Sequence, residues 1–287
     1  MELAPETDEE ICMVGSTVLI TGATDGLGHA LALSLAKRGA KLAVHGRCDR
    51  KLEKLISRLR TAGAVDITAF RADLADLTQV RAFSAQVLER LPRLDVLVNN
   101  AGVGFAAPEG EHRIETTDGL ELRLAVNYVA GVELSLGVLP LLRQTGGARI
   151  VNVASKGQHP LEFEDLQFRR GYNSLTAYRR SKLAQIMGGF ALASRVAPDQ
   201  VTVNSLHPAT YMPTKMVLQG RGEAVDKIET GVRAVEHLVL DPALAHQTGT
   251  YFDGLSPALA HPQAYEHQAQ QRLWEWTCGL LGRSTDL

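Results

Sequence analysis

The stretch TVLITGATDGLG, residues 17–28, decides how this chain folds. Its first four residues are β-branched or apolar, which is the composition of a short buried strand. Its turn contains Gly22, Gly26 and Gly28, which allow tight backbone bends and let an anion approach the start of the next helix. The stretch therefore predicts a strand, a phosphate-binding turn and a helix, with a purely structural turn as the alternative.

The alternation of strand and helix continues along the chain. Apolar runs without polar alternation are typical of strands buried on both faces of a sheet, and the intervening segments are long enough for crossover helices. We predict an α/β fold with one Rossmann-type, doubly wound parallel sheet of about seven strands and helices on both faces. The expected strands are 17–20, 42–44, 67–70, 95–98, 149–153, 201–204 and 250–252, and the expected helices are 28–38, 50–61, 77–90, 118–143 and 177–196.

Length and composition fit a single domain. The 287 residues are 45% hydrophobic and 22% charged, as in ordinary globular proteins. We expect a flexible tail over residues 1–14 and one domain over residues 15–287. The domain is expected to end in a helix over residues 262–281 that carries Trp274 and Trp276.

Composition also argues against several classes of protein. A formal net charge of −2 offers no basic surface for nucleic acid. The apolar run 129–142 is interrupted by Glu133 and Pro140, so no membrane span is expected. The acidic N-terminus lacks the features of a signal peptide, and three scattered cysteines form no disulfide framework or CxxC motif. We therefore expect a cytoplasmic protein without a bound metal.

The end of the second strand indicates which dinucleotide the turn would bind. NAD sites place a carboxylate there for the ribose 2′-hydroxyl, whereas an arginine accommodates the 2′-phosphate of NADP. Here Arg47 follows the strand and the first carboxylate is Asp49, so the sequence favours NADP, unless Arg47 is only a solvated surface charge. Asp73 and Leu74 follow the third strand, where an adenine edge needs an acceptor and an apolar neighbour. Asp73 is equally suited to cap helix 77–90, and the two roles can coexist.

Tyr178 and Lys182 lie four residues apart in a predicted helix and thus share one face. A phenol has a pKa near ~10, and a neighbouring ammonium lowers that value. The pair therefore predicts a tyrosine that gives or takes a proton.

In combination, these motifs resemble the short-chain dehydrogenase/reductase family over about residues 16–254. The family's TGxxxGxG motif is matched at residues 21–28 and its Asn-Asn-Ala-Gly motif at residues 99–102. Its catalytic tetrad falls on Asn127, Ser155, Tyr178 and Lys182. The resemblance implies that the cofactor is held by Gly22, Thr24, Asp25, Gly26, Leu27, Gly28, Arg47, Asp73, Leu74, Asn100, Ala101, Gly102, Tyr178, Lys182, Pro208, Thr210 and Thr214.

The resemblance also implies a mechanism, in which a hydride passes between NADPH and a ketone or aldehyde. Tyr178 would act as the general acid or base, and Ser155 would hydrogen-bond the substrate oxygen. Lys182 would lower the Tyr178 pKa and hold the nicotinamide ribose. Asn127 would hold a water that links Lys182 to solvent, or its amide would only bond the backbone within its helix.

The chain departs from the family's pattern at two places. Residues 207–214, HPATYMPT, carry Ala209 where glycine is common, so either Thr210 or Thr214 is the cofactor contact. Ser155 and Tyr178 are 23 positions apart, longer than usual, and the loop between them resembles that of the retinol-dehydrogenase-like branch. Its aromatic residues either wall a substrate pocket or pack the loop down.

We therefore expect an NADP-dependent oxidoreductase acting on the carbonyl, or in reverse the secondary alcohol, of a medium-sized lipophilic molecule. One alternative is an NAD-dependent alcohol dehydrogenase. Another is a non-catalytic NADP-binding sensor or scaffold. Family members often pair through the helices that carry Asn127 and Tyr178, so we expect a homodimer or homotetramer.

Overall fold

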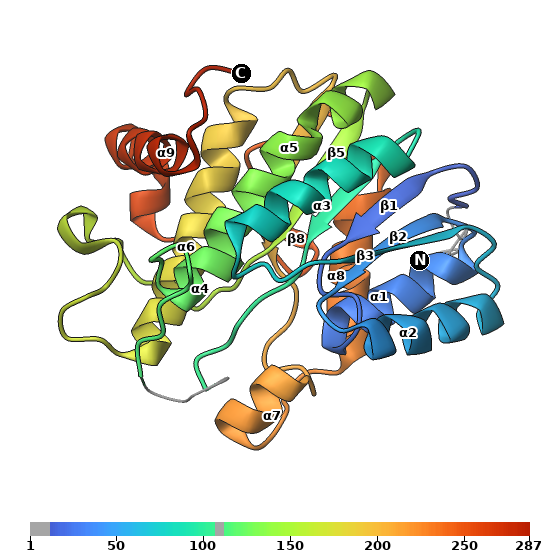
Figure 1. Cartoon of the computed structure of the whole chain (residues 1–287), viewed down its shortest axis with the longest axis horizontal. Coiled ribbons are helices and arrows are strands. Elements are labelled where there is room, and N and C mark those ends of the chain that lie inside the picture. The colour runs from blue at the N-terminus through green and yellow to red at the C-terminus, as the bar shows by residue number, and fades with distance from the viewer. Residues whose placement is uncertain (1–11, 107–111) are drawn as a thin grey trace, which may run out of the picture.

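A central sheet of eight strands organises the molecule (Figure 1). The computed structural model describes residues 12–106 and 112–287. The strand order is β3-β2-β1-β4-β5-β6-β7-β8, and all pairs are parallel except β7 with β8. The strands are β1 (Thr17–Ile20), β2 (Lys41–Gly46), β3 (Ile67–Arg71), β4 (Val96–Asn99), β5 (Ala148–Val153), β6 (Val201–His207), β7 (Tyr251–Asp253) and β8 (Ser256–Ala258).

Helices cover both faces of this sheet, as the sequence predicts. Helices α1, α2 and α8 lie on one face, while α3, α5 and α6 lie on the other, with α9 packed outside α6 (Figure 1). The helices are α1 (Gly26–Lys37), α2 (Asp49–Thr61), α3 (Leu77–Arg90), α4 (Leu122–Leu124), α5 (Ala130–Thr145), α6 (Ser174–Ala193), α7 (Lys215–Arg221), α8 (Ile228–Leu240) and α9 (His267–Leu281). Shorter turns are η1 (Ala125–Val129), η2 (Phe163–Asp165), η3 (Pro242–Leu244) and η4 (Pro262–Tyr265).

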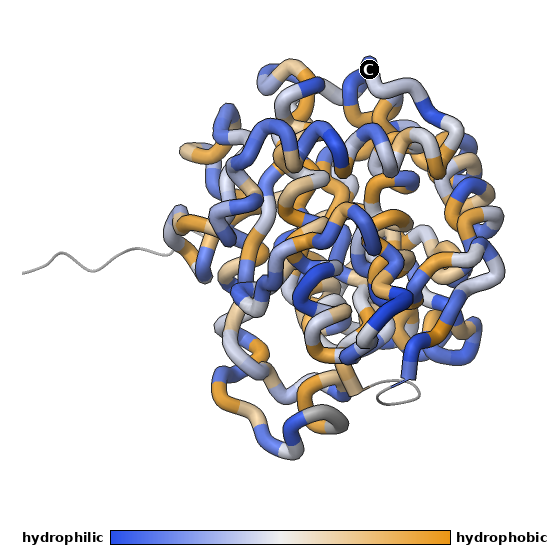
Figure 2. The backbone as a smooth tube through the Cα atoms, turned by 90° about the vertical axis from the view of Figure 1, so that its left-hand side faces the viewer, coloured by the Kyte–Doolittle hydropathy of each residue, from blue (hydrophilic) through white to orange (hydrophobic). Residues whose placement is uncertain are grey.

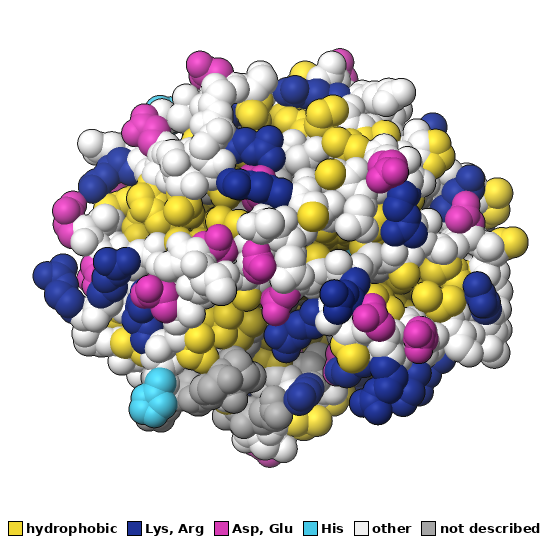
Figure 3. All heavy atoms as spheres, in the orientation of Figure 1, with side chains coloured by type: hydrophobic (Ala, Val, Ile, Leu, Met, Phe, Trp, Pro, Cys, Tyr) yellow, Lys and Arg dark blue, Asp and Glu magenta, His cyan; other side chains and the backbone are white. Residues whose placement is uncertain are grey.

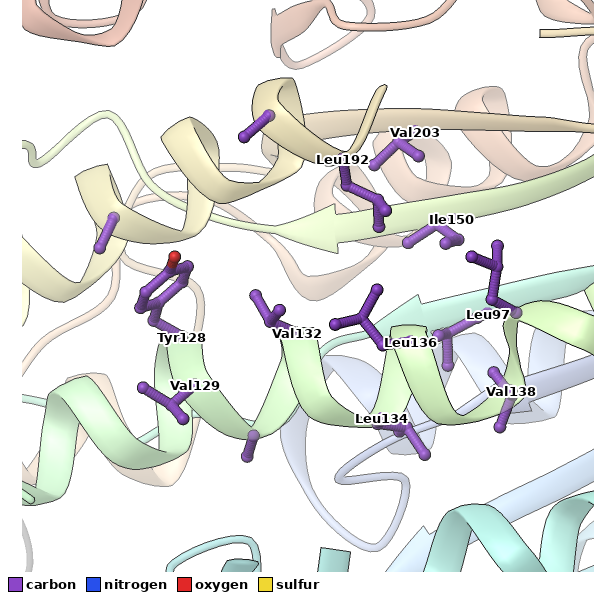
Figure 4. Close-up of a cluster of buried hydrophobic side chains, with 14 of the residues drawn as sticks. Leu97, Tyr128, Val129, Val132, Leu134, Leu136, Val138, Ile150, Leu192 and Val203 are labelled. Atoms are coloured by element: carbon purple, nitrogen blue, oxygen red, sulfur yellow. The ribbon is translucent and has the colours of Figure 1, made fainter. Parts of the chain in front are cut away.

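The strands supply two hydrophobic cores because their side chains alternate between faces. In β1, Leu19 belongs to the core under α3, α5 and α6, while Val18 and Ile20 belong to the core under α1 and α8. Apolar stretches accordingly run through the middle of the molecule (Figure 2). Figure 4 shows the first core, where Tyr128 and Leu136 project from the α5 side toward α6 and Ile150 of β5.

Helices α4, η1 and α5 form one stretch, Leu122–Thr145, of 24 residues. Its mean hydropathy of 1.5 and its length would suffice to cross a membrane, but 78% of the apolar window is buried inside the fold. A place in the core therefore accounts for its composition. The stretch includes a π-helical turn, η1, a rare feature that often marks functional positions.

The structure differs from the sequence-based expectations at several elements. An eighth strand, β8, pairs antiparallel with β7, and its three residues include Pro257, which masks any strand signal. Helix α8, which packs on α1, was not predicted from the sequence. The predicted C-terminal helix is divided, because Glu266 separates η4 from α9.

Most of the predicted flexible tail, residues 1–11, lies outside the described residues. The described end of that tail is packed: Met13 is buried, and its N–H donates to the Arg38 carbonyl at 2.9 Å.

Helix α9 is fixed to α6 and η1 by buried contacts. Trp274 is 0% exposed, and the Arg195 guanidinium carbon lies 4.9 Å from its ring centre. The Tyr128 and Thr277 hydroxyls, both buried, lie 2.6 Å apart. Because α9 covers part of α6, a pairing face that uses α6 would have to accommodate α9. The homodimer or homotetramer expected from the sequence therefore stays a prediction.

Trp274 and Trp276 provide a matched test of this packing. We expect Trp274→Ala to lower the free energy of unfolding by about 3–5 kcal/mol, since it leaves a cavity in an enclosed site. Trp276, two positions later, is only half-buried, so Trp276→Ala should cost less than half as much. Urea titration measures both values, and equal losses would contradict this placement of α9.

Candidate functional site

The predicted site residues meet at one edge of the sheet. The glycine turn follows β1, Arg47 follows β2, the segment 100–102 follows β4, and Ser155 follows β5. Parallel strands place their carboxyl ends at the same edge, and the order reverses between β1 and β4. In doubly wound sheets a ligand binds at that reversal.

The glycine turn has a geometry that side chains would disrupt. Gly22 and Gly26 have φ values of +65° and +52°, in the left-handed region that favours glycine. A Cβ at Gly28 would lie 2.4 Å from Asn100 Nδ2 and 2.5 Å from the Gly22 carbonyl oxygen. The third glycine is therefore required by close packing of α1 against the segment after β4.

Asn100 and Thr21 hold the turn against that segment. The Asn100 amide donates to the carbonyl oxygens of Thr21 and Gly22 at 2.8 Å and 3.3 Å. The Thr21 hydroxyl accepts from the N–H groups of Asn100 and Ala101 at 2.9 Å and 3.0 Å. Asn100 thus supports the turn through its side chain.

His45 also holds the turn, a role that sequence reasoning missed. Burial lowers the pKa of His45 to about 4, so its ring is neutral at physiological pH. Its Nδ1 accepts from the Gly22 N–H at 3.2 Å, and its Nε2 lies 3.1 Å from the Ala72 carbonyl, to which it donates. The only sequence signal is a histidine inside a strand that is otherwise apolar.

The start of α1 fits a pyrophosphate. Asp25 caps the helix by accepting from the Gly26 N–H at 2.9 Å. Within the described chain, the N–H groups of Leu27 and Gly28 have no protein acceptor. These donors and the helix dipole would stabilise an anion placed against the glycine turn.

Positive charge surrounds the end of β2. Arg47 is exposed, and among the described residues no carboxylate pairs with it; Asp49 instead pairs with Arg71 at 3.6 Å. A shallow groove of about 300 Å³ between α1 and α2 is lined by four basic side chains and by Asp25, which pairs with Lys51 at 3.1 Å, and the Lys and Arg cluster is visible in Figure 3. Those lining side chains are Arg50, Lys51, Lys54 and Arg58.

Asp73 does not cap α3, contrary to one of the two roles expected for it. The cap is Asp76, whose side chain accepts from the N–H groups of Thr78 and Gln79. Asp73 instead accepts from the Ala75 N–H at 3.0 Å, in a local turn. The helix begins at Leu77, so Asp76 is the residue directly before it, where a cap belongs. The adenine role of Asp73 and of the buried Leu74 stays a prediction.

The structure separates the two candidate threonines after Pro208, which is buried at the end of β6. The Thr210 hydroxyl lies 3.2 Å from His207 Nε2, while the Thr210 N–H donates to Asp226. Thr214 lies beside the glycine turn: a Cβ on Gly26 would be 3.1 Å from its methyl group. Thr214 is therefore the better placed of the two for a cofactor contact.

Ser155 and Tyr178 meet across the edge of the sheet. Asn173 caps α6 by accepting from the Thr176 N–H, so the helix starts at Ser174 and brings Tyr178 onto its second turn. The Ser155 hydroxyl accepts from the Gly157 N–H at 3.0 Å, and the Ser155 side chain lies close enough to the Tyr178 phenol to lower its pKa. Tyr178 keeps part of its surface accessible, yet burial of its hydroxyl is the main cause that raises its pKa, against the lowering effect of Ser155.

Lys182 is buried next to this pair. Its Nζ donates to the Val153 carbonyl at 2.8 Å and to Gln185 Oε1 at 3.1 Å. Burial lowers the pKa of Lys182 to about 7. The expectation that Lys182 lowers the Tyr178 pKa is not met in this structure, because Nζ lies 6.0 Å from the tyrosine ring centre and burial dominates. Gln185, one turn further along, is a partner that sequence reasoning missed.

Asn127 occupies the π-helical turn, and both the oxygen and the nitrogen of its side-chain amide make hydrogen bonds. Its Oδ1 accepts from the Val103 N–H at 2.7 Å, and its Nδ2 donates to the Val103 carbonyl and to Ser181 Oγ. A Cβ on Gly102 would lie 3.2 Å from Asn127 Oδ1 and 3.7 Å from Lys182 Nζ. Asn127 therefore positions the segment after β4 next to Lys182. Its water-holding role stays a prediction.

The aromatic residues of the long loop pack the loop down. Phe163 lies 4.6 Å from the Arg272 guanidinium carbon of α9, and Phe168 lies 4.2 Å from that of Arg180. The aromatic ring that faces Tyr178 is instead Phe105, whose centre is 6.3 Å away at 70°. The sequence gives no signal for Phe105, because this residue lies in an irregular segment and is separated from Tyr178 by more than seventy positions in the sequence.

The Rossmann-like fold, with Ser155, Tyr178 and Lys182 brought together at the carboxyl edge of its sheet, is that of an oxidoreductase class. The profile of the short-chain dehydrogenase family matches residues 16–223, and this chain belongs to that family.

Named relatives agree with this membership. The chain is 32% identical to human retinol dehydrogenase 13, over 93% of this chain and 85% of that protein. The crystal structure of an uncharacterised Mycobacterium paratuberculosis protein superposes with a TM-score of 0.78 at 26% identity, covering 97% of this chain and 98% of that one. A short-chain dehydrogenase of Escherichia coli CFT073, solved with NADPH, superposes with a TM-score of 0.70 at 24% identity, covering 86% and 99%.

Burial of Lys182 makes stability depend on pH. The unfolded chain keeps the Lys182 proton up to pH about 10.5, whereas the folded protein releases it near pH 7. The folded state is therefore penalised most below pH 7, and the penalty fades toward pH 10.5. From pH 6 to pH 10, wild type should gain on the order of 4 kcal/mol over Lys182→Met in free energy of unfolding.

Urea titrations of both proteins at the two pH values measure this change. Lys54→Met, at an exposed lysine of α2, is the control and should show little pH-dependent difference from wild type. A difference between wild type and Lys182→Met that is the same at both pH values would contradict the buried charge.

Proposed function

We propose that this protein is an NADP-dependent carbonyl reductase, which reduces a ketone or aldehyde of a medium-sized lipophilic molecule and runs in reverse on the secondary alcohol. The observation that carries the proposal is the juxtaposition of Ser155 and Tyr178, close enough for Ser155 to lower the pKa of the phenol, beside the buried Lys182. A non-catalytic sensor would have no need for this contact next to a buried lysine.

The chain's own groups supply the proton side of the reaction. When bound, the nicotinamide supplies the hydride. Ser155 orients the carbonyl oxygen by donating a hydrogen bond, which strengthens as negative charge grows on that oxygen. Tyr178 gives its proton to the same oxygen, and its raised pKa keeps the phenol protonated at neutral pH. Lys182, buried beside the pair, would hold the nicotinamide ribose of the bound cofactor.

The preference for NADP rests on the surroundings of β2. Arg47 is exposed and unpaired among the described residues, and Asp49 is engaged by Arg71. A 2′-phosphate at this edge would meet Arg47 and the cationic mouth of the groove between α1 and α2. The fold relative solved with NADPH is compatible with this reading.

The preference for lipophilic substrates rests on the walls near Tyr178. Phe105 lies against the tyrosine, and a Cβ on Gly104 would lie 2.3 Å from the Met216 side chain of α7. Tyr211 is close enough to Tyr178 to raise the pKa of that tyrosine. These side chains are apolar or aromatic, and Met adapts to irregular ligands. The name of the human relative, retinol dehydrogenase 13, points to a lipophilic alcohol for that protein.

Removal of the proposed acid tests the mechanism. Tyr178→Phe should lower kcat for ketone reduction by about 10²–10⁴-fold, because the growing alkoxide loses its proton donor. The Kd for NADPH, measured by nicotinamide fluorescence, should change little and shows that the variant is folded. Unchanged kcat across a ketone panel would remove Tyr178 from the mechanism.

Removal of one charge tests the cofactor. Arg47→Ala should weaken NADPH binding by about tenfold, because it removes one charge-assisted contact to the 2′-phosphate. The Kd for NADH should stay nearly constant. Arg60→Ala removes the same charge at the far end of α2 and is the matched control. Wild type that binds NADH and NADPH equally would favour the NAD-dependent alternative.

A further inference from the structure

A buried ion pair lies beside the segment that carries Phe105, next to Tyr178, and has no part in the proposed chemistry. Arg123 is 0% exposed and Glu121 is 2% exposed, and Arg123 Nη1 lies 3.4 Å from Glu121 Oε1. Buried charges cost free energy unless every donor and acceptor finds a partner. The partners of this pair therefore show what the pair holds in place.

Arg123 holds the backbone that carries Phe105. Its Nε donates to the Gly104 carbonyl and its Nη2 to the Phe105 carbonyl, both at 3.0 Å. A guanidinium is planar and rigid, so two bonds to successive carbonyls fix the orientation of that peptide. The Phe105 ring extends from it to lie edge-on against Tyr178.

Tyr172 connects this pair to the long loop. Its hydroxyl accepts from Arg123 Nη1 at 2.7 Å and donates to Glu121 Oε1 at 2.9 Å, so it bridges the two charges. Burial and the Glu121 carboxylate raise the pKa of Tyr172, which keeps the bridging proton in place. Glu121 Oε2 is occupied as well, by the Leu124 N–H at 2.8 Å.

The loop itself is anchored, so Tyr172 has a fixed position. The Tyr172 ring packs on Phe168, whose ring centre is 5.2 Å away. Phe168 is held under the Arg180 guanidinium, and Gln167 accepts from the Glu121 N–H at 2.9 Å. A rigid chain of contacts thus runs from the loop through the ion pair to the ring beside Tyr178.

We propose that Phe105 is a residue that determines substrate selectivity, and that the Tyr172–Glu121–Arg123 network is the device that positions it against Tyr178. This inference rests on the proposed function. The long loop then acts on the substrate indirectly, through the network, while its own aromatic rings stay packed in the loop. A bulky lipophilic ketone gains contact with the fixed Phe105 edge, whereas a small ketone does not reach it.

A double-mutant cycle tests whether Tyr172 acts through Phe105. Phe105→Ala should lower the ratio of kcat/KM for a bulky aromatic ketone to that for acetone by about tenfold, mainly through KM. Tyr172→Phe should lower the same ratio in part. In the Phe105→Ala background, Tyr172→Phe should have little further effect, because its target ring is gone. Full additivity, or an unchanged ratio in Phe105→Ala, overturns the proposal.

A matched variant controls for the loss of a buried hydroxyl. Tyr128→Phe removes the hydroxyl that pairs with Thr277, at 2.6 Å, beneath α9. It should lower stability and leave the substrate ratio unchanged. An equal change of the ratio in Tyr128→Phe and Tyr172→Phe would reduce the role of Tyr172 to general stability.

Hydrogen exchange separates this inference from the proposed function. Amides of residues 103–106 should exchange faster in Tyr172→Phe than in wild type or Tyr128→Phe, because the network no longer fixes their backbone. This readout needs no turnover, so it is interpretable even if wild type reduces none of the ketones. Unchanged exchange in Tyr172→Phe overturns the positioning role.

Discussion

The parallel pairing of β1 with β4 places every other part of the site. Its register, Val18 opposite Val96 and Ile20 opposite Val98, brings Thr21 level with the segment that follows β4. The Thr21 hydroxyl can then accept from the Asn100 N–H, and the Asn100 amide can hold the glycine turn. A shift by one residue would turn the buried side chains to the opposite face and break these contacts.

Burial of polar groups gives the site its chemical properties. Tyr178 has a raised pKa and Lys182 a lowered one, in both cases because burial disfavours the charged form. The protein compensates for the buried lysine with defined partners, Val153 and Gln185, and Ser155 lowers the pKa of the tyrosine. Such groups are costly to bury, and ionisable groups with perturbed pKa values beside the glycine turn mark this edge as a candidate functional site.

Much of the fold and site could be predicted because the signals are local. The strand and glycine pattern of residues 17–28, the alternation that follows it and the spacing of Tyr178 and Lys182 are all periodic or contiguous in the sequence. The predictions that failed concern neighbouring residues that could take the same role, and contacts between segments that lie far apart in the sequence. Asp73 and Asp76 are equally good caps by composition, and only the helix start at Leu77 selects Asp76.

The sequence by itself determined the fold class, the glycine turn and the Tyr178–Lys182 pair on which the proposed mechanism rests, because each depends on short-range spacing and on residue types with specific conformations or pKa values. Tertiary structure alone decided which groups surround them. His45 supports the turn, Gln185 receives Lys182, and Phe105 rather than a loop aromatic faces Tyr178. These contacts join residues brought together by packing, and the cost of burying their polar groups is known only once the fold encloses them.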